Sequence, residues 1–282
     1  MIRFIAPLLL GALAALPARA QQLPVFEVGI AGGGGSLPAY PASSQNQWRG
    51  LLVPYVIYRG STLRADDGGV RARASLADGI ELSVSASGGV NASSDDVTVR
   101  QGMPDLQWLG EIGPNLRFIL WRGENEASPA RLVIDAPVRA VFSTDWSSVS
   151  FRGFTFAPDI AYERMHVFSQ YARLRVSAGV LFGTDAFTDY FYDVAPEYAR
   201  PGRPAYNAQP GYVGARLSVS YRLPLSERLS VIAGARIENF SGSANADSPL
   251  FRSEWNASVV AGFAFALWRS EARVDVTAQP FD

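Results

Sequence analysis

The stretch GMPDLQWLGEIGPNLRFIL, residues 102–120, decides the fold. It opens with a turn at 102–105, after which apolar and polar side chains alternate. A period of two is that of an extended strand with one apolar and one polar face. The alternating part after the turn is about 15 residues long. It exceeds both the five or six residues of a typical globular strand and the roughly 9–11 that cross a bilayer. The apolar parity holds Leu106, Trp108, Ile112, Leu116, Phe118 and Leu120, and the polar parity holds Gln107, Glu111, Asn115 and Arg117.

The same alternation recurs along nearly the whole chain, with turn or loop residues between the repeats. At roughly 20–22 residues per strand and connection, the chain predicts about 12 strands, an even number as in bacterial single-chain barrels. That count includes two irregular segments, 149–162 and 188–196, as strands. The regular segments are 25–35, 51–59, 70–76, 80–90, 130–142, 167–182, 212–223, 229–240 and 256–268.

Charged side chains stand in the middle of these segments, opposite the apolar parity. In a soluble sandwich they would face water, whereas in a membrane barrel they would line the lumen while the apolar face meets lipid. Strand length, aliphatic mid-strand positions with aromatics towards the ends, and an export signal without any cysteine favour the barrel. The candidate lumen charges are Glu81, Glu111, Arg117, Arg131, Asp135, Arg139, Arg173, Arg175, Arg216, Arg236 and Glu238.

The prediction is therefore an all-β fold, a transmembrane antiparallel β-barrel of about 12 strands with ten or fourteen as the alternatives. Residues 1–20 predict a cleaved signal peptide, because an apolar run follows Arg3 and ends at the cleavage site Ala18-Arg19-Ala20. The barrel is expected over 21–268. The tail 269–282 alternates weakly and is expected to be either a periplasmic extension or a further strand.

The sequence offers little for catalysis or for metals. His166 is the single histidine, and a catalytic histidine needs a nucleophile or a carboxylate beside it. Phe168 stands where outer-membrane phospholipases carry the serine of H-x-S, and Arg164 where omptin proteases carry the aspartate of D-x-H. No G-x-S-x-G occurs, and one histidine without cysteine forms no transition-metal set. No enzyme activity, cofactor or metal is expected.

Two acidic pairs, Asp66-Asp67 and Asp95-Asp96, could bind calcium if they lie in loops, although too few further ligands are evident. Solvated turn carboxylates are the favoured interpretation. A formal net charge of −1 gives no basic excess for a nucleic-acid partner.

Several segments resemble motifs of one family. Residues 52–73, LVPYVIYRGSTLRADDGGVRAR, resemble its PYxxYRG…L…GGVR signature; 102–106 with 111–114 resemble GMPDL…EIGP; 191–192 through 204–206 resemble FYGV…PAY; and 246–250 resemble ADSPL. These motifs are similar to those of the MipA/OmpV family, the MltA-interacting protein and its relatives. The resemblance implies a protein of the Gram-negative outer membrane without known catalysis. It also implies possible partners, since the best-described member is a scaffold that brings a lytic transglycosylase together with a penicillin-binding peptidoglycan synthase.

Two functions follow as hypotheses: that scaffold, and a passive channel for small solutes. The candidate lumen charges are seven arginines and four carboxylates, which predicts extensive pairing and an occluded interior. If the lumen is open instead, its excess of positive charge predicts a preference for anions.

Overall fold

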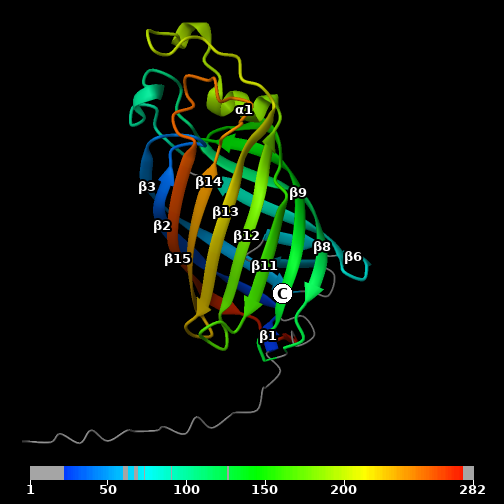
Figure 1. Cartoon of the computed structure of the whole chain (residues 1–282). Coiled ribbons are helices and arrows are strands. Elements are labelled where there is room, and N and C mark those ends of the chain that lie inside the picture. The colour runs from blue at the N-terminus through cyan, green and yellow to red at the C-terminus, as the bar shows by residue number, and fades with distance from the viewer. Residues whose placement is uncertain are drawn as a thin grey trace, which may run out of the picture.

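One antiparallel sheet carries most of the chain in the computed structural model (Figure 1). The structure describes residues 22–59, 63–66, 69–72, 74–89, 91–125 and 127–275; the predicted signal peptide and the end of the tail lie outside this range. The strands of the sheet are β2 (Phe26–Pro38), β3 (Asn46–Arg59), β4 (Leu63–Asp66), β5 (Gly69–Ala72), β6 (Ala74–Ala77), β7 (Ile80–Gly89), β8 (Trp108–Arg122), β9 (Ala130–Thr144), β10 (Val149–Phe156), β11 (Asp159–Met165), β12 (Arg173–Gly183), β13 (Gly211–Pro224), β14 (Leu229–Asn239) and β15 (Trp255–Arg269).

The pairing of neighbouring strands closes this sheet into a barrel. β15 pairs with β2, which joins the two ends of the chain, and β5 lies beside β7, which brings together the two edges of the sheet. β10 and β11 lie end to end beside β9 and β12, and β5 and β6 are separated by position 73 alone. Counting each of these two pairs as one leaves twelve barrel strands among the described residues, the predicted number.

Two segments differ from the prediction. The stretch 188–196, counted as a strand, instead belongs to the helix α1 (Asp185–Tyr192) and the loop that follows it. β4, a strand that the sequence did not suggest, completes the twelve. Segment 149–162, by contrast, is extended as expected and forms β10 and most of β11.

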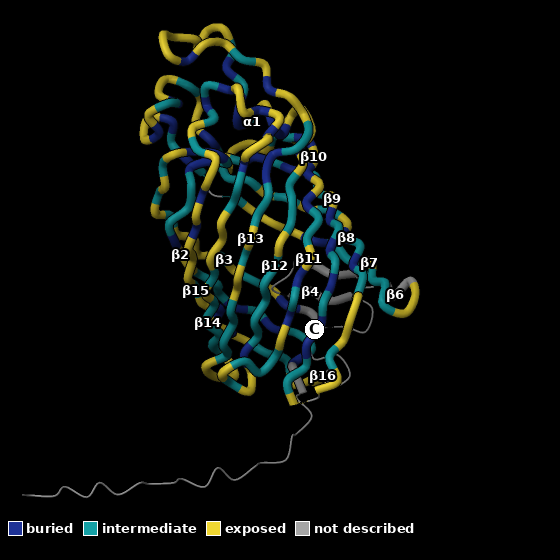
Figure 2. Tube along the Cα trace, in the orientation of Figure 1, coloured by how far each residue is buried: buried dark blue, intermediate teal, exposed yellow. Residues whose placement is uncertain are grey.

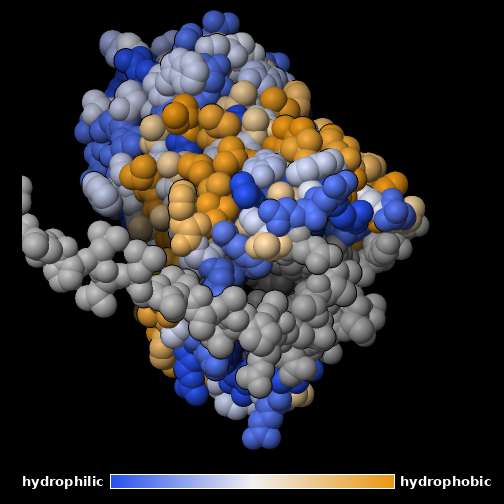
Figure 3. Space-filling model, turned by 60° about the horizontal axis from the view of Figure 1, so that its bottom comes forward, coloured by the Kyte–Doolittle hydropathy of each residue, from blue (hydrophilic) through white to orange (hydrophobic). Residues whose placement is uncertain are grey.

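The two faces of the barrel wall differ in chemistry. Ile112 and Leu120 of β8 are exposed on the outside, while Asn115 and Arg117 of the same strand are buried on the inside. Hydrophobic side chains gather on the wall, with hydrophilic ones at the loops (Figure 3). This is the arrangement of a barrel that faces lipid outside and carries polar groups inside. Among the described residues, no helix is long and apolar enough to cross a membrane.

The hydrophobic core of the protein lies in a cap at one end of the barrel (Figure 2). α1 contributes Phe187, Thr188, Phe191 and Tyr192, which share one helical face at i, i+4 spacing and are buried. The Tyr192 hydroxyl donates to the Pro41 carbonyl at 3.2 Å, which ties the helix to the β2–β3 loop. The cap is also built from loops 91–107, 193–210 and 240–254.

The first and last described strands lie at the opposite end, called here the terminus end (Figure 1). There β1 (Gln22–Pro24) pairs with β16 (Arg273–Asp275) in a separate two-stranded sheet. The described part of the tail therefore adds no strand to the barrel. Residues 276–282 lie outside the described range.

Candidate functional site

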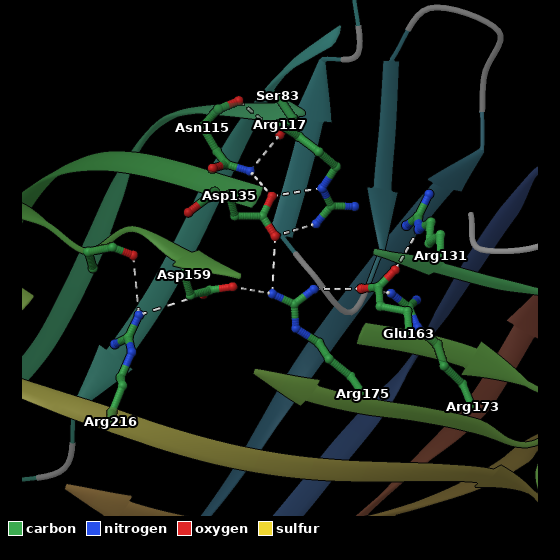
Figure 4. A network of polar contacts seen from close by, with 12 residues as sticks. Ser83, Asn115, Arg117, Arg131, Asp135, Asp159, Glu163, Arg173, Arg175 and Arg216 are labelled. Atoms are coloured by element: carbon green, nitrogen blue, oxygen red, sulfur yellow. Dashed lines mark hydrogen bonds and ion pairs between the residues drawn. The ribbon is translucent and has the colours of Figure 1, made fainter. Parts of the chain in front are cut away.

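A network of ion pairs occupies one wall of the lumen, centred on Glu163 of β11 (Figure 4). Pairing in register sets Glu163 between Arg131 of β9 and Arg175 of β12. Its carboxylate oxygens lie 2.6 Å from Arg131 Nε, 2.6 Å from Arg175 Nη1 and 2.8 Å from Arg173 Nη2. One fully buried carboxylate therefore joins three arginines from the two flanking strands.

Asp135 of β9 is the second centre of the network. Arg117 of β8 donates to both of its carboxylate oxygens, at 2.7 and 2.9 Å, the bidentate geometry that suits a guanidinium best. Asn115 Nδ2 donates to the same carboxylate at 2.8 Å. Arg175 Nη2 lies 3.1 Å from Asp135 and 2.8 Å from Asp159. Arg175 therefore connects three carboxylates and makes one network of the two centres.

The network extends to β13, where Arg216 lies 3.9 Å from Asp159. It thus ties together β8, β9, β11, β12 and β13 across the inside of the wall (Figure 4). A charge removed from water is costly unless it is paired and hydrogen-bonded, so these positions must be satisfied together. Each guanidinium here has a carboxylate partner, which is what permits so many charges to be buried.

A smaller polar group lies nearer the cap. Arg139 Nη1 is 3.6 Å from the Glu111 carboxylate, and Arg139 Nε donates to Ser85 Oγ at 2.5 Å. Thr155 Oγ1 donates to Glu111 at 3.2 Å. Polar contacts therefore continue along this wall towards the cap.

The opposite wall, formed by β13, β14, β15, β2 and β3, has a different character. Gly33, Leu51 and Val260 point inward on this wall. Leu51 and Val260 are nevertheless 43% and 40% exposed. Arg236 is exposed as well, and its Nε donates to Ser218 Oγ at 3.3 Å. The lumen therefore has one wall with an extended network of bonded charges, and an opposite wall that is more accessible to water around Leu51, Val260 and Arg236.

The sequence matches a family model described as MltA-interacting protein MipA over residues 30–267. The chain belongs to the MipA family. No curated protein matches it. It is similar to a solved structure described as a bacterial polysaccharide outer membrane secretin, at 10% identity and a TM-score of 0.33, over 88% of this chain and 99% of that one. It is also similar to Acinetobacter baumannii CarO2, at 10% identity and a TM-score of 0.20, over 88% of this chain and 100% of that one.

Most of the candidate lumen charges of this MipA-family barrel meet in the two polar groups. Arg117, Arg131, Asp135, Arg173, Arg175 and Arg216 belong to the network, and Glu111 and Arg139 form the group nearer the cap. Glu81 lies directly opposite Arg117 in the register of β7 and β8. Arg236 and Glu238 belong to neither group: Arg236 donates to Ser218, and Glu238 lies opposite Arg216 in the register of β13 and β14.

Two members of the network, Asp159 and Glu163, were not identified from the sequence. Residue 163 falls in the predicted connection between segments 149–162 and 167–182, whereas β11 continues to Met165 and the turn begins after it. Both carboxylates fall on one parity of the short alternating stretch 159–163, with Ile160 and Tyr162 on the other. That alternation was the available signal, and it supplies the carboxylates that the excess of arginine required.

The groups considered for catalysis or metal binding lie elsewhere. His166 occupies the β11–β12 turn, where its Nδ1 lies 2.8 Å from the Ala127 carbonyl oxygen. Asp95 and Asp96 are exposed in a cap loop, while Asp67 and the Asp66 side chain fall outside what the structure describes. Within the described residues, no group of three or more acidic, histidine or cysteine side chains could hold a metal ion.

Proposed function

We propose that this chain is a non-enzymatic barrel of the Gram-negative outer membrane that acts as a scaffold for cell-wall machinery rather than as an open pore. The observation that carries this proposal is the network centred on Glu163 and Asp135, which lines one side of the lumen beneath the hydrophobic core of the cap. A barrel of about 12 strands is also narrower than open porins of 16–18 strands. Its useful surfaces are then its two ends.

The ends are oriented by the lengths of their connections. Outer-membrane barrels have short turns on the periplasmic side and longer loops outside. The long connections 91–107, 184–210 and 240–254 all lie at the cap, and the terminus end has the shorter turns 166–172 and 225–228. We therefore assign the cap to the cell exterior and the terminus end to the periplasm, where peptidoglycan enzymes work.

The turn 166–172 presents a candidate docking point at the terminus end. Phe168 is 98% exposed, and both it and His166 adopt positive φ, a conformation that costs non-glycine residues energy. The turn is held by the Tyr221 hydroxyl, which donates to the Val167 carbonyl at 2.8 Å, and by His166 against Ala127. An aromatic side chain held out in this way matches the anchor residues that dominate protein interfaces.

The proposed partners are those of the family: a lytic transglycosylase, as the name MltA-interacting protein suggests, and a penicillin-binding synthase. The test is capture of these two enzymes from envelope extracts by the wild-type barrel, Phe168→Ser and Trp146→Ser. Trp146 is a matched control, because it too is an exposed aromatic residue, at 77%, with positive φ. It lies in the β9–β10 turn at the cap, away from the terminus end.

Loss of capture with Phe168→Ser alone supports a periplasmic docking surface. If wild type captures neither enzyme, the scaffold proposal fails. If both variants capture as well as wild type, the turn 166–172 is not the docking point.

A second candidate function, passage of small anions, is favoured by the accessible wall that bears Leu51, Val260 and Arg236. It requires a path for ions past the hydrophobic cap core at the outer end of the barrel. Conductance distinguishes the two functions.

A further inference from the structure

A pocket of about 510 Å³ opens on the surface of the cap. Four separate loops line it: the β2–β3 loop, the segment around Thr98, the segment 200–203, and the segment around Arg252. A volume of this size lies within the range of small-ligand sites, roughly 300–1,000 Å³. None of this pocket belongs to the lumen network or to the terminus end.

Three arginines, Arg200, Arg203 and Arg252, line the pocket, and no carboxylate is among its described lining residues. This differs from the lumen, where each guanidinium of the network has a carboxylate partner. Concentrated charge of one sign without a counterion favours the binding of the opposite charge. The pocket therefore attracts an anion.

Arg203 is the fixed member of the three. Its guanidinium donates to the carbonyls of Tyr198 at 2.6 and 3.0 Å, Val99 at 2.8 Å and Gln101 at 3.0 Å. Burial, and then the charge of Arg200, lower the pKa of Arg203. Arg203 contributes a positioned charge, and most of its hydrogen-bonding capacity is already used.

Arg200 and Arg252 are exposed, and they provide the adjustable donors. Arg200 uses one nitrogen to donate to the Thr98 carbonyl at 3.1 Å, which leaves the rest of its guanidinium available. The neighbouring hydroxyl of Ser44 is exposed. Two guanidinium groups with a hydroxyl beside them suit a phosphate ester, because arginine binds phosphate in a bidentate manner.

We propose that this pocket binds a phosphate ester through Arg200 and Arg252, with Arg203 adding fixed positive charge. The phosphate comes either from the phosphorylated glycolipid of the outer leaflet or from a free sugar phosphate outside the cell. The ligand chemistry is the same in both cases. This site is independent of the scaffold role, since it lies on the face opposite to the proposed docking point.

The experiment measures binding to the purified full-length mature protein in non-ionic detergent by titration calorimetry. The probes are glucose 6-phosphate against glucose, and phosphorylated lipid A against dephosphorylated lipid A. The variant Arg200→Gln/Arg252→Gln removes the two exposed donors and keeps Arg203, which donates to the carbonyls of Tyr198, Val99 and Gln101. The matched control is Arg228→Gln, an exposed arginine in the β13–β14 turn at the terminus end.

The wild-type protein and Arg228→Gln should bind a phosphorylated probe and not its neutral counterpart. The double variant should bind it about tenfold more weakly or worse, since hydrogen bonds to charged groups are worth that much or more. Binding confined to lipid A identifies the glycolipid as the source, whereas binding of glucose 6-phosphate identifies a free ligand. Equal binding of phosphorylated and neutral probes overturns the proposal, and so does equal affinity of the double variant and Arg228→Gln.

Discussion

Replacement of Glu163 by glutamine should destabilise the barrel by about 3 kcal/mol. Loss of one partner from a buried ion pair costs about 3–5 kcal/mol, because it leaves the other charge uncompensated. Arg175 retains Asp135 and Asp159, and the Arg173 side chain is 28% exposed, so these two arginines are partly compensated. Arg131 is buried and loses the carboxylate 2.6 Å from its Nε. The expected cost therefore falls at the lower end of that range.

The assay is equilibrium unfolding in urea from lipid vesicles, followed by tryptophan fluorescence. Glu111→Gln is the control, since the same chemical change is made at a longer ion pair of 3.6 Å whose side chains are less buried. It should cost about 1 kcal/mol. A second variant, Glu163→Gln/Arg131→Met, removes both charges and should recover part of the loss. Equal losses of unfolding free energy for Glu163→Gln and Glu111→Gln would refute the reasoning, because the network would then stabilise the barrel no more than the Glu111–Arg139 pair does.

Two further predictions test the wall and the cap. Val219→Arg places a cation on the lipid face and should cost about 2–4 kcal/mol near the midplane, whereas Ser218→Arg points into the lumen and should fold nearly normally; equal effects on heat-modifiable gel mobility would reject this assignment of faces. Burial raises the pKa of Tyr40 to about 12. Its contribution to the free energy of unfolding is therefore complete below about pH 10, where the tyrosine is protonated in both states. That contribution is lost as pH rises from about 10 to about 12. Tyr40→Phe should remove that part of the pH dependence while losing about 1 kcal/mol with the hydrogen bond to the Leu250 carbonyl; identical pH profiles of unfolding free energy for the two proteins would contradict it.

The barrel and its two faces were predictable because alternation is a local property. In β8 the outward side chains Ile112 and Leu120 and the inward side chains Glu111 and Arg117 follow from their parity alone. Once one side of a strand faces lipid, every second side chain of that strand must be apolar. The charged candidates could therefore be placed inside without knowing their partners.

Two carboxylate partners of those charges, Asp159 and Glu163, were missed because they lie on the short strand β11, directly after a bulge in β10. Between Phe151 and Phe154 the register of β10 shifts, at Gly153 with its positive φ, and outward exposure passes from odd to even positions. The alternation then looks irregular in sequence. The predicted segment ends at residue 162, one position before Glu163, whereas β11 continues to Met165.

The cap was hidden for a different reason. α1 is only eight residues long, and a helix of that length is not stable by itself in water. It depends on the packing of Phe187, Phe191 and Tyr192 against loops distant in the sequence. Such contacts cannot be seen from local periodicity.

The central claim is that this barrel is closed rather than a pore, and conductance of the refolded wild-type protein in a planar bilayer tests it most directly. A lumen with the network of Glu163 and Asp135 on one wall and the hydrophobic core of the cap above it should give no steady openings. Steady openings, with reversal potentials under a salt gradient that show selectivity for anions, would contradict the claim and establish the channel instead.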